Sequence, residues 1–397
     1  MNAERSRRAA FALTAILLAL LAGEAAFRLV FPLPEISNFN RVDYSELRRG
    51  VRDQPPLMNA SIRWTSEPDQ ATYVHALNLY GFRDERTWTA RPDPRRHRVM
   101  FLGDSFVEGM MAGDHETIPW VFEHGVRSVV WLIDPAAPVE AMNFGMGGTG
   151  LGHDLRLASA AIPLFRPQTV VLVLYANDLP PPALDPRWLA PSFHPVRFHR
   201  WIPRAAHVVR RALKGRPVPR RWHTAPFSFF GAVPDPTNPL SDRAPGYEPF
   251  IEPALLDSMK RGTFNPYLSD HLARSAEALV APIDARPHLE ALAALAQRHH
   301  AELRVAYLPH ALQVSDHYLA FARRYAVEKA EGSLTEARYQ QHAAALAETC
   351  RGLSLPFLDL TPAIRGEEQA GRHLYWDYDN HLRPTGYAFV ARAIAAW

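Results

Sequence analysis

Residues 169–175 read Thr-Val-Val-Leu-Val-Leu-Tyr, and this run decides the class of fold. The run is apolar without alternation and rich in β-branched residues, as in a strand buried on both faces of a parallel sheet. Comparable short runs occur before and after it, with helical spacings between them. The further predicted strands are 98–102, 139–144, 303–308 and 357–360. Strands that alternate with helices predict a parallel sheet of about five strands, covered by helices on both faces.

The connecting segments show the 3.6-residue periodicity of helices that pack on such a sheet. The predicted helices are 118–133, 155–161, 289–296, 321–350 (mostly helical) and 387–397. Ligands of parallel α/β sheets bind at the carboxyl ends of the strands. We therefore expect the catalytic or ligand-binding side chains to lie in the residues that follow each strand.

Composition narrows the function further. The chain has 397 residues, a formal net charge of +3 and a single cysteine, Cys350. One cysteine excludes an intrachain disulfide and a cysteine-based zinc site, and we expect no metal and no cofactor. The small net charge gives no reason to expect nucleic acid as a partner.

The amino terminus has the pattern of a targeting segment. Arg5, Arg7 and Arg8 precede an uncharged run at 9–23, and the apolar character continues to residue 31. We expect residues 1–8 to be a cytoplasmic basic start and 9–31 a transmembrane anchor, with a cleaved signal segment as the alternative. Residues 32–97 form an extended connector outside the cytoplasm, and 98–397 form the main domain.

The first chemical motif follows the strand at 98–102, where Gly103-Asp104-Ser105 ends an apolar run. A strand-to-helix turn presents a serine hydroxyl and places backbone N–H groups beside it, as a nucleophile and an oxyanion site require. Taken alone, the same tripeptide is more typical of a helix cap than of a nucleophile.

Three later segments supply what a serine nucleophile needs. Glycines at 145–150 expose backbone N–H groups, and Asn177 follows the strongest strand with a side-chain amide that can donate to an oxyanion. His381 can accept the serine proton, and a neighbouring carboxylate can hold its imidazole in the required tautomer. Read separately, these segments are also typical of a glycine-rich turn, an Asn-Asp turn and a solvent-exposed histidine.

Taken together, the four segments resemble the SGNH (GDSL-type) hydrolase superfamily, over about residues 78–397. The resemblance also covers Asn78-Leu-Tyr-Gly-Phe-Arg-Asp84, which is similar to the lead-in of membrane-anchored bacterial members. It implies a flavodoxin-like three-layer α/β/α sandwich. It further implies Ser105 as nucleophile, His381 as base, and an oxyanion hole of the Ser105 and Gly145 N–H groups with the Asn177 side chain.

The chain departs from the family pattern at several positions. Phe106 replaces the usual leucine after the serine, and Tyr175 occupies a position where glycine is usual. Tyr378 occupies the place of the usual aspartate three residues before the histidine. We therefore expect Asp379 to be the triad acid, as in relatives that modify exported polysaccharides, with Asp377 as the alternative.

A long segment rich in proline and arginine, at about 179–267, follows Asn177 and would lie near the site. Its basic residues suit an anionic headgroup or an acidic glycan, or form a solvated loop. We expect an exported serine esterase, held at the membrane with its catalytic domain periplasmic or extracellular, that acts on an O-acyl ester of a carbohydrate or lipid. The alternatives are an O-acyltransferase with the same triad and a non-catalytic glycan-binding or assembly protein.

Overall fold

The fold is described from a computed structural model. It describes residues 2–30, 60–62, 73–75, 78, 82–86, 88–126, 128–132, 134–135, 137–147, 149–179, 278–322, 333–377 and 381–397. Most of the expected connector and nearly all of the insertion expected at 179–267 lie outside these residues, as do Tyr378, Asp379 and Asn380.

A five-stranded parallel sheet forms the centre of the chain, in the order β4-β3-β5-β6-β7. The predicted strands are confirmed to within one or two residues at each end. Their bounds are β3 His97–Gly103, β4 Val139–Gly145, β5 Thr169–Tyr175, β6 Glu302–Leu308 and β7 Phe357–Asp359. The prediction of an α/β protein with a central parallel sheet is therefore confirmed.

The strand order places the predicted motifs together. From β3 the chain moves outward to β4, and then crosses back to β5 on the other side of β3. Such a reversal leaves a crevice at the carboxyl ends of the two central strands, where α/β proteins bind ligands. Ser105 follows β3 and Asn177 follows β5, so both lie at this edge.

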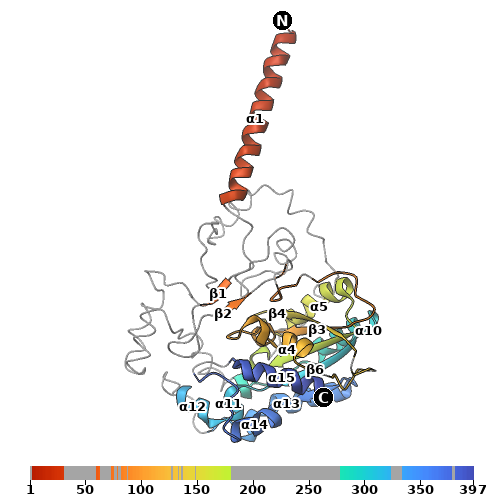
Figure 1. The fold of residues 1–397 in the computed structure, drawn as a ribbon, viewed down its shortest axis with the longest axis vertical. Helices are drawn as coiled ribbons and strands as arrows, with labels where there is room; N and C mark the ends of the chain where they lie inside the picture. The colour runs from red at the N-terminus through yellow and green to blue at the C-terminus, as the bar shows by residue number, and fades with distance from the viewer. Residues whose placement is uncertain are drawn as a thin grey trace, which may run out of the picture.

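Helices cover both faces of the sheet (Figure 1). Alternate strand residues belong to two separate cores. In β3, Met100 and Leu102 belong to one core, and Val99 and Phe101 belong to the other. The first core is covered by α5 (Leu151–Phe165), α10 (Arg286–Arg298) and α13 (Gln341–Gly352). The second is covered by α4 (Ile118–His124), α14 (Thr361–Gln369) and α15 (Pro384–Ala396).

One helix prediction is wrong in extent. The helix expected at 118–133 ends at His124, where Gly125 caps it, and Val129 and Leu132 are buried from an irregular segment instead. Val129 and Leu132 have helical spacing but belong to turns, which periodicity alone cannot distinguish from helix. The region expected to be mostly helical at 321–350 holds the end of α12 (Asp316–Ala322), the short 3-10 helix η7 (Ala337–Tyr339) and most of α13, and its described residues are mostly helical, as predicted.

Other elements were not predicted or are longer than predicted. Helix α5 extends beyond the expected 155–161 at both ends, and α14 has no counterpart among the predictions. The short elements are α3 (Ser105–Glu108), η2 (Asp114–Glu116), η3 (Ala176–Asp178) and α11 (Ala311–Val314). Two short strands of the expected connector, β1 (Ala60–Ile62) and β2 (Tyr73–His75), pair antiparallel to each other.

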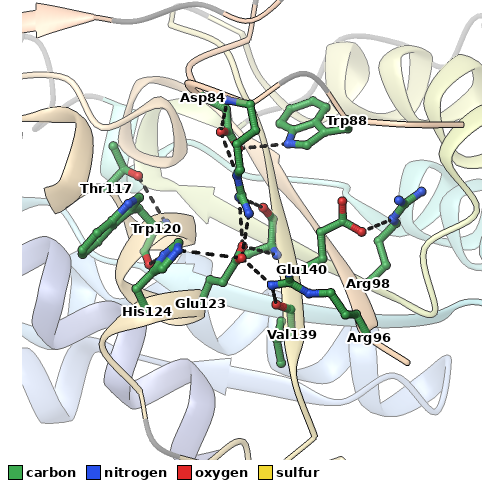
Figure 2. A network of polar contacts seen from close by, with 12 residues as sticks. Asp84, Trp88, Arg96, Arg98, Thr117, Trp120, Glu123, His124, Val139 and Glu140 are labelled. Atoms are coloured by element: carbon green, nitrogen blue, oxygen red, sulfur yellow. Dashed lines mark hydrogen bonds and ion pairs between the residues drawn. The ribbon is translucent and has the colours of Figure 1, made fainter. Parts of the chain in front are cut away.

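The segment that leads into β3 is fastened to the open edge of β4. Glu123 of α4 accepts hydrogen bonds from Arg86 at 2.7 and 2.9 Å, from Arg96 at 2.6 Å and from the Ala141 N–H at 2.8 Å. Figure 2 shows Glu123 at the centre of this network, with Arg96 also donating to the Val139 carbonyl. The unpaired edge of a parallel sheet needs such cover, and charged side chains provide it here.

The amino-terminal helix α1 runs from Asn2 to Val30. Its described apolar side chains between Phe11 and Leu21 are exposed. Within the part of the chain that the structure describes, no helix has both the length and the apolar content needed to cross a membrane.

Candidate active site

Ser105 and His381 meet at the carboxyl edge of the sheet, although 276 positions separate them in sequence. The Nε2 atom of His381 lies 2.8 Å from Ser105 Oγ, and both residues are buried. With the proton of the neutral ring on Nδ1, Nε2 accepts a hydrogen bond from the serine hydroxyl. This is the contact through which a histidine acts as general base toward serine.

The turn after β3 holds Ser105 at the first position of the short helix α3. Asp104 caps this helix, and its Oδ1 accepts the Phe106 N–H at 2.9 Å. Its Oδ2 lies 3.5 Å from Ser105 Oγ, a much longer contact than the one to His381. The serine proton is therefore directed to the imidazole rather than to the cap carboxylate.

His381 belongs to a loop that is closed by backbone contacts on both sides. Its carbonyl accepts the Trp376 N–H at 3.0 Å, and Tyr375 and Leu382 form an antiparallel bridge. Arg383 donates from Nε to the Tyr375 carbonyl at 2.7 Å. These contacts fix the backbone from which the imidazole reaches Ser105.

A column of rings lies beside the Ser105–His381 contact. The ring centroids of His381 and Phe106 are 5.0 Å apart, those of Phe106 and Tyr175 are 4.0 Å apart, and those of Tyr175 and His310 are 5.6 Å apart. Phe106 and Tyr175 are two positions at which the sequence departs from the family pattern. Since their rings pack on each other, the two departures are structurally linked.

The glycine turn after β4 packs directly on α3. The Gly145 N–H donates to Asn143 Oδ1 at 3.0 Å, and the Gly147 N–H donates to Glu108 Oε2 at 2.8 Å. Gly147 lies close to the nucleophile, because a Cβ at this position would be 3.7 Å from Ser105 Cβ. The predicted oxyanion donor Gly145 therefore already has an acceptor at the end of its own strand, β4, and its catalytic role stays a prediction.

The structure describes only some of the remaining predicted site residues. Asn177 lies in η3 directly after β5, but its side chain is outside the described part of the structure. The predicted triad acid Asp379 also lies outside the described residues. The alternative acid, Asp377, has its Oδ1 2.8 Å from His317 Nε2 and 3.2 Å from Arg383. Both assignments of the acid stay predictions.

Several buried carboxyl groups surround the nucleophile. Burial raises the pKa of Asp104 to about 6, with the Phe106 N–H and His381 acting in the opposite direction. Burial likewise raises the pKa of Asp154 and of Asp178 well above the ordinary range, and the charge of Asp104 adds to both shifts. Burial of these carboxyl groups therefore favours their protonated forms.

No group of three or more histidine, cysteine, aspartate or glutamate side chains among the described residues is arranged to hold a metal ion.

No family model matches the sequence, and no curated protein matches it either.

Sequence reasoning missed three of the groups that shape the site. Glu108 holds the glycine turn, Asp154 lies buried on α5, and Asp178 accepts the Tyr175 N–H at 2.8 Å. Glu108 and Asp178 each lie within three residues of a predicted site residue, so proximity in sequence was an available signal. Asp154 had no such signal beyond a carboxylate near the start of an otherwise apolar helix.

Proposed function

We propose that the chain is a serine esterase of the SGNH type, which forms an acyl-enzyme on Ser105. The observation that carries the proposal is the 2.8 Å contact between His381 Nε2 and Ser105 Oγ, made at the carboxyl edge of the sheet. The strand order supports the finer assignment to a flavodoxin-like three-layer sandwich, because the five strands, numbered along the chain, follow the order 2-1-3-4-5.

The proposed reaction begins when His381 takes the proton of Ser105 as Oγ attacks the ester carbonyl. A bond forms between Oγ and the carbonyl carbon, and the carbonyl oxygen becomes negatively charged. Donors beside the serine stabilise this oxygen, and we assign that role to the Ser105 N–H, the Gly145 N–H and the Asn177 side chain. His381 then gives its proton to the leaving alcohol, and water attacks the acyl-enzyme in the same way.

The developing imidazolium of His381 needs a negative partner. In this proposal Asp379 is the residue that orients the ring, and Asp377 is the alternative. Asp104 is a third negative group near the ring, because His381 interacts electrostatically with its carboxylate. Opposite charges in a buried site favour the protonated imidazole that the transition state requires.

The amino-terminal helix supports an exported, membrane-held location for the enzyme. Between Phe11 and Leu21 the named apolar side chains are 51–78% exposed. A helix that is apolar all round requires cover by lipid or protein. We propose that α1 is held in a membrane, either as an anchor or as a signal segment, with the basic start on the cytoplasmic side.

The central test is labelling with a fluorophosphonate probe, which reacts with activated serines. We expect the native chain to be labelled, and Ser105→Ala and His381→Ala to lose labelling. Ser159→Ala and His299→Ala are matched controls, because they remove the same residue types outside the site. A native chain that stays unlabelled, or a Ser105→Ala variant that is still labelled, would contradict the proposal.

Two further comparisons refine the assignment. Asp379→Asn is expected to lose activity and Asp377→Asn to keep most of it; the reverse result makes Asp377 the acid. An acetyl-ester assay with added oligosaccharides separates hydrolysis from transfer. Faster acyl release together with a modified glycan would identify the chain as an acyltransferase rather than a hydrolase.

A further inference from the structure

Two carboxylate oxygens beside the candidate active site are buried without a donor. They are Oδ2 of Asp154 and Oδ1 of Asp178. Asp154 lies in the first turn of α5 and is 1% exposed, and Asp178 ends η3 and is 3% exposed. An isolated buried carboxylate is strongly unfavourable unless it is paired or protonated. Each of these two oxygens therefore needs a proton or a donor that the described contacts do not supply.

Gly150 relates the two carboxyl groups in space. It caps the amino end of α5, and a Cβ at this position would lie 3.6 Å from Asp178 Oδ1. Asp154 is four residues further along α5 and donates its N–H to the Gly150 carbonyl at 3.0 Å. Residues four apart share a helix face, and helical side chains lean toward the amino end. The Asp154 side chain therefore leans toward the end of the helix that Asp178 contacts.

Electrostatics agree with this arrangement. Burial raises the pKa of Asp178 most, followed by the charges of Asp104 and of Asp154. Burial also raises the pKa of Asp154, followed by the charge of Asp104.

Other ionisable groups adjoin the pair, on α5 and across the site. His153 and Arg156 are neighbours on α5, Glu108 adds a negative charge to the Asp104 region, and His381 adds a positive one when protonated. Two ionised carboxylates in this mainly acidic interior would repel each other, whereas one proton between them removes the repulsion.

We propose that Asp154 and Asp178 share one proton, as a carboxylic acid hydrogen-bonded to a carboxylate. The O–H of one residue then supplies the donor that both buried oxygens lack. The remaining negative charge lies near the amino end of the 15-residue helix α5, where the helix dipole favours it. The pair fastens η3, and therefore the backbone of Asn177, to α5. Its catalytic consequence rests on the proposed function, but the shared proton itself does not.

A shared proton predicts that the stability of the folded chain decreases as the pH rises. A carboxyl group whose pKa is raised by folding binds its proton more tightly in the folded than in the unfolded chain. The free energy of unfolding is then greatest at low pH, where the folded chain holds the proton, and it falls as the pH rises through the raised pKa. In Asp154→Asn, an amide N–H replaces the shared proton and does not titrate, so this part of the fall should disappear.

Thermal unfolding of the full chain between about pH 5 and 9 tests this. We expect the melting temperature of the native chain to fall more steeply with pH than that of Asp154→Asn. Asp284→Asn, which changes an exposed helix-capping aspartate, is the control and should follow the native slope. Infrared spectroscopy gives a direct readout, because the native chain at pH 7 should show a carboxylic-acid carbonyl band that Asp154→Asn lacks. Parallel slopes together with no such band would overturn the shared proton.

Labelling kinetics then test the positioning role. If η3 is held by the pair, Asp154→Leu should label at least about tenfold more slowly than Asp154→Asn, since a displacement of roughly 1 Å has effects of this size or larger. Equal labelling rates with the infrared result intact would overturn the positioning role alone. A native chain without any labelling would refute the proposed function, while the unfolding and infrared results would still decide on the shared proton.

Discussion

Gly145→Ala adds a single methyl group, and the structure predicts that this methyl group displaces the nucleophile Ser105. A Cβ at Gly145 would lie 2.0 Å from the Glu108 amide nitrogen and 2.4 Å from the Val107 carbonyl carbon. Both neighbours are backbone atoms of α3, so no side-chain rotation relieves the overlap. Helix α3 has to move away from β4, and Ser105 moves with it.

The size of the displacement follows from these distances. Real Cβ contacts are essentially never shorter than 3.0 Å, so the contact of 2.0 Å must open by about 1 Å. Overpacking of this kind costs about 1–3 kcal/mol of stability. A misplacement of about 1 Å at a reacting group costs about 100-fold in rate. We therefore expect Gly145→Ala to fold with stability reduced by about 1–3 kcal/mol and to label about 100-fold more slowly than the native chain.

The assay combines urea unfolding with the rate of fluorophosphonate labelling. Gly366→Ala is the control, because no atom lies within 4 Å of a Cβ added at this position in α14. It should leave labelling unchanged and add up to about 1 kcal/mol of stability, since alanine is the better helix former. If Gly145→Ala labels at the native rate, the packing of α3 against Gly145 does not fix the position of Ser105.

Three further predictions follow from buried contacts. Phe106→Leu removes the ring that lies 5.0 Å from His381, and we expect labelling up to about tenfold slower, since such ring pairs contribute about 0.5–1.5 kcal/mol; an unchanged rate would show that the ring does not orient the histidine. Arg83→Lys cannot reproduce the guanidinium contacts to Asp114 and the Ala112 carbonyl, and should cost about 3 kcal/mol in urea unfolding; a loss below about 1 kcal/mol would contradict this. Burial raises the pKa of Cys350 to about 12, so it should react with a thiol reagent at pH 8 only after denaturant is added, and fast reaction of the folded chain would be inconsistent with its position.

The sheet could be predicted because the strands bury apolar residues on both faces. The run at 169–175 is fully buried in the structure, as its composition requires. The helix ends were harder to predict, since Gly125 stops α4 while buried residues such as Val129 continue at compatible spacing. Whether a buried residue follows a helix or a turn depends on the tertiary packing, which local spacing does not contain.

At the candidate site, the sequence placed Ser105 and His381 at one edge of the sheet, where they are in contact. It did not reveal which side chains already engage the backbone donors, whether these side chains come from the same strand or from another segment. The Gly145 N–H is occupied by Asn143 within its own strand end, whereas the Gly147 N–H is held by Glu108 from α3. Hydrogen-bond partners of this kind are set by side-chain direction in the folded chain, and motif spacing does not report it.

The loop that carries His381 is held by an ion pair between Asp377 and Arg383. Asp377 lies four residues before the histidine and is held by His317 and Arg383. Arg383, two residues after the histidine, also binds the Tyr375 carbonyl and lies over the Trp376 ring at 4.6 Å. The guanidinium thus connects both ends of the loop, and Asp377 neutralises it. Asp377→Asn should therefore loosen this loop even where Asp379 orients the imidazole, so partial loss of activity in that variant indicates positioning, and only complete loss indicates the triad acid.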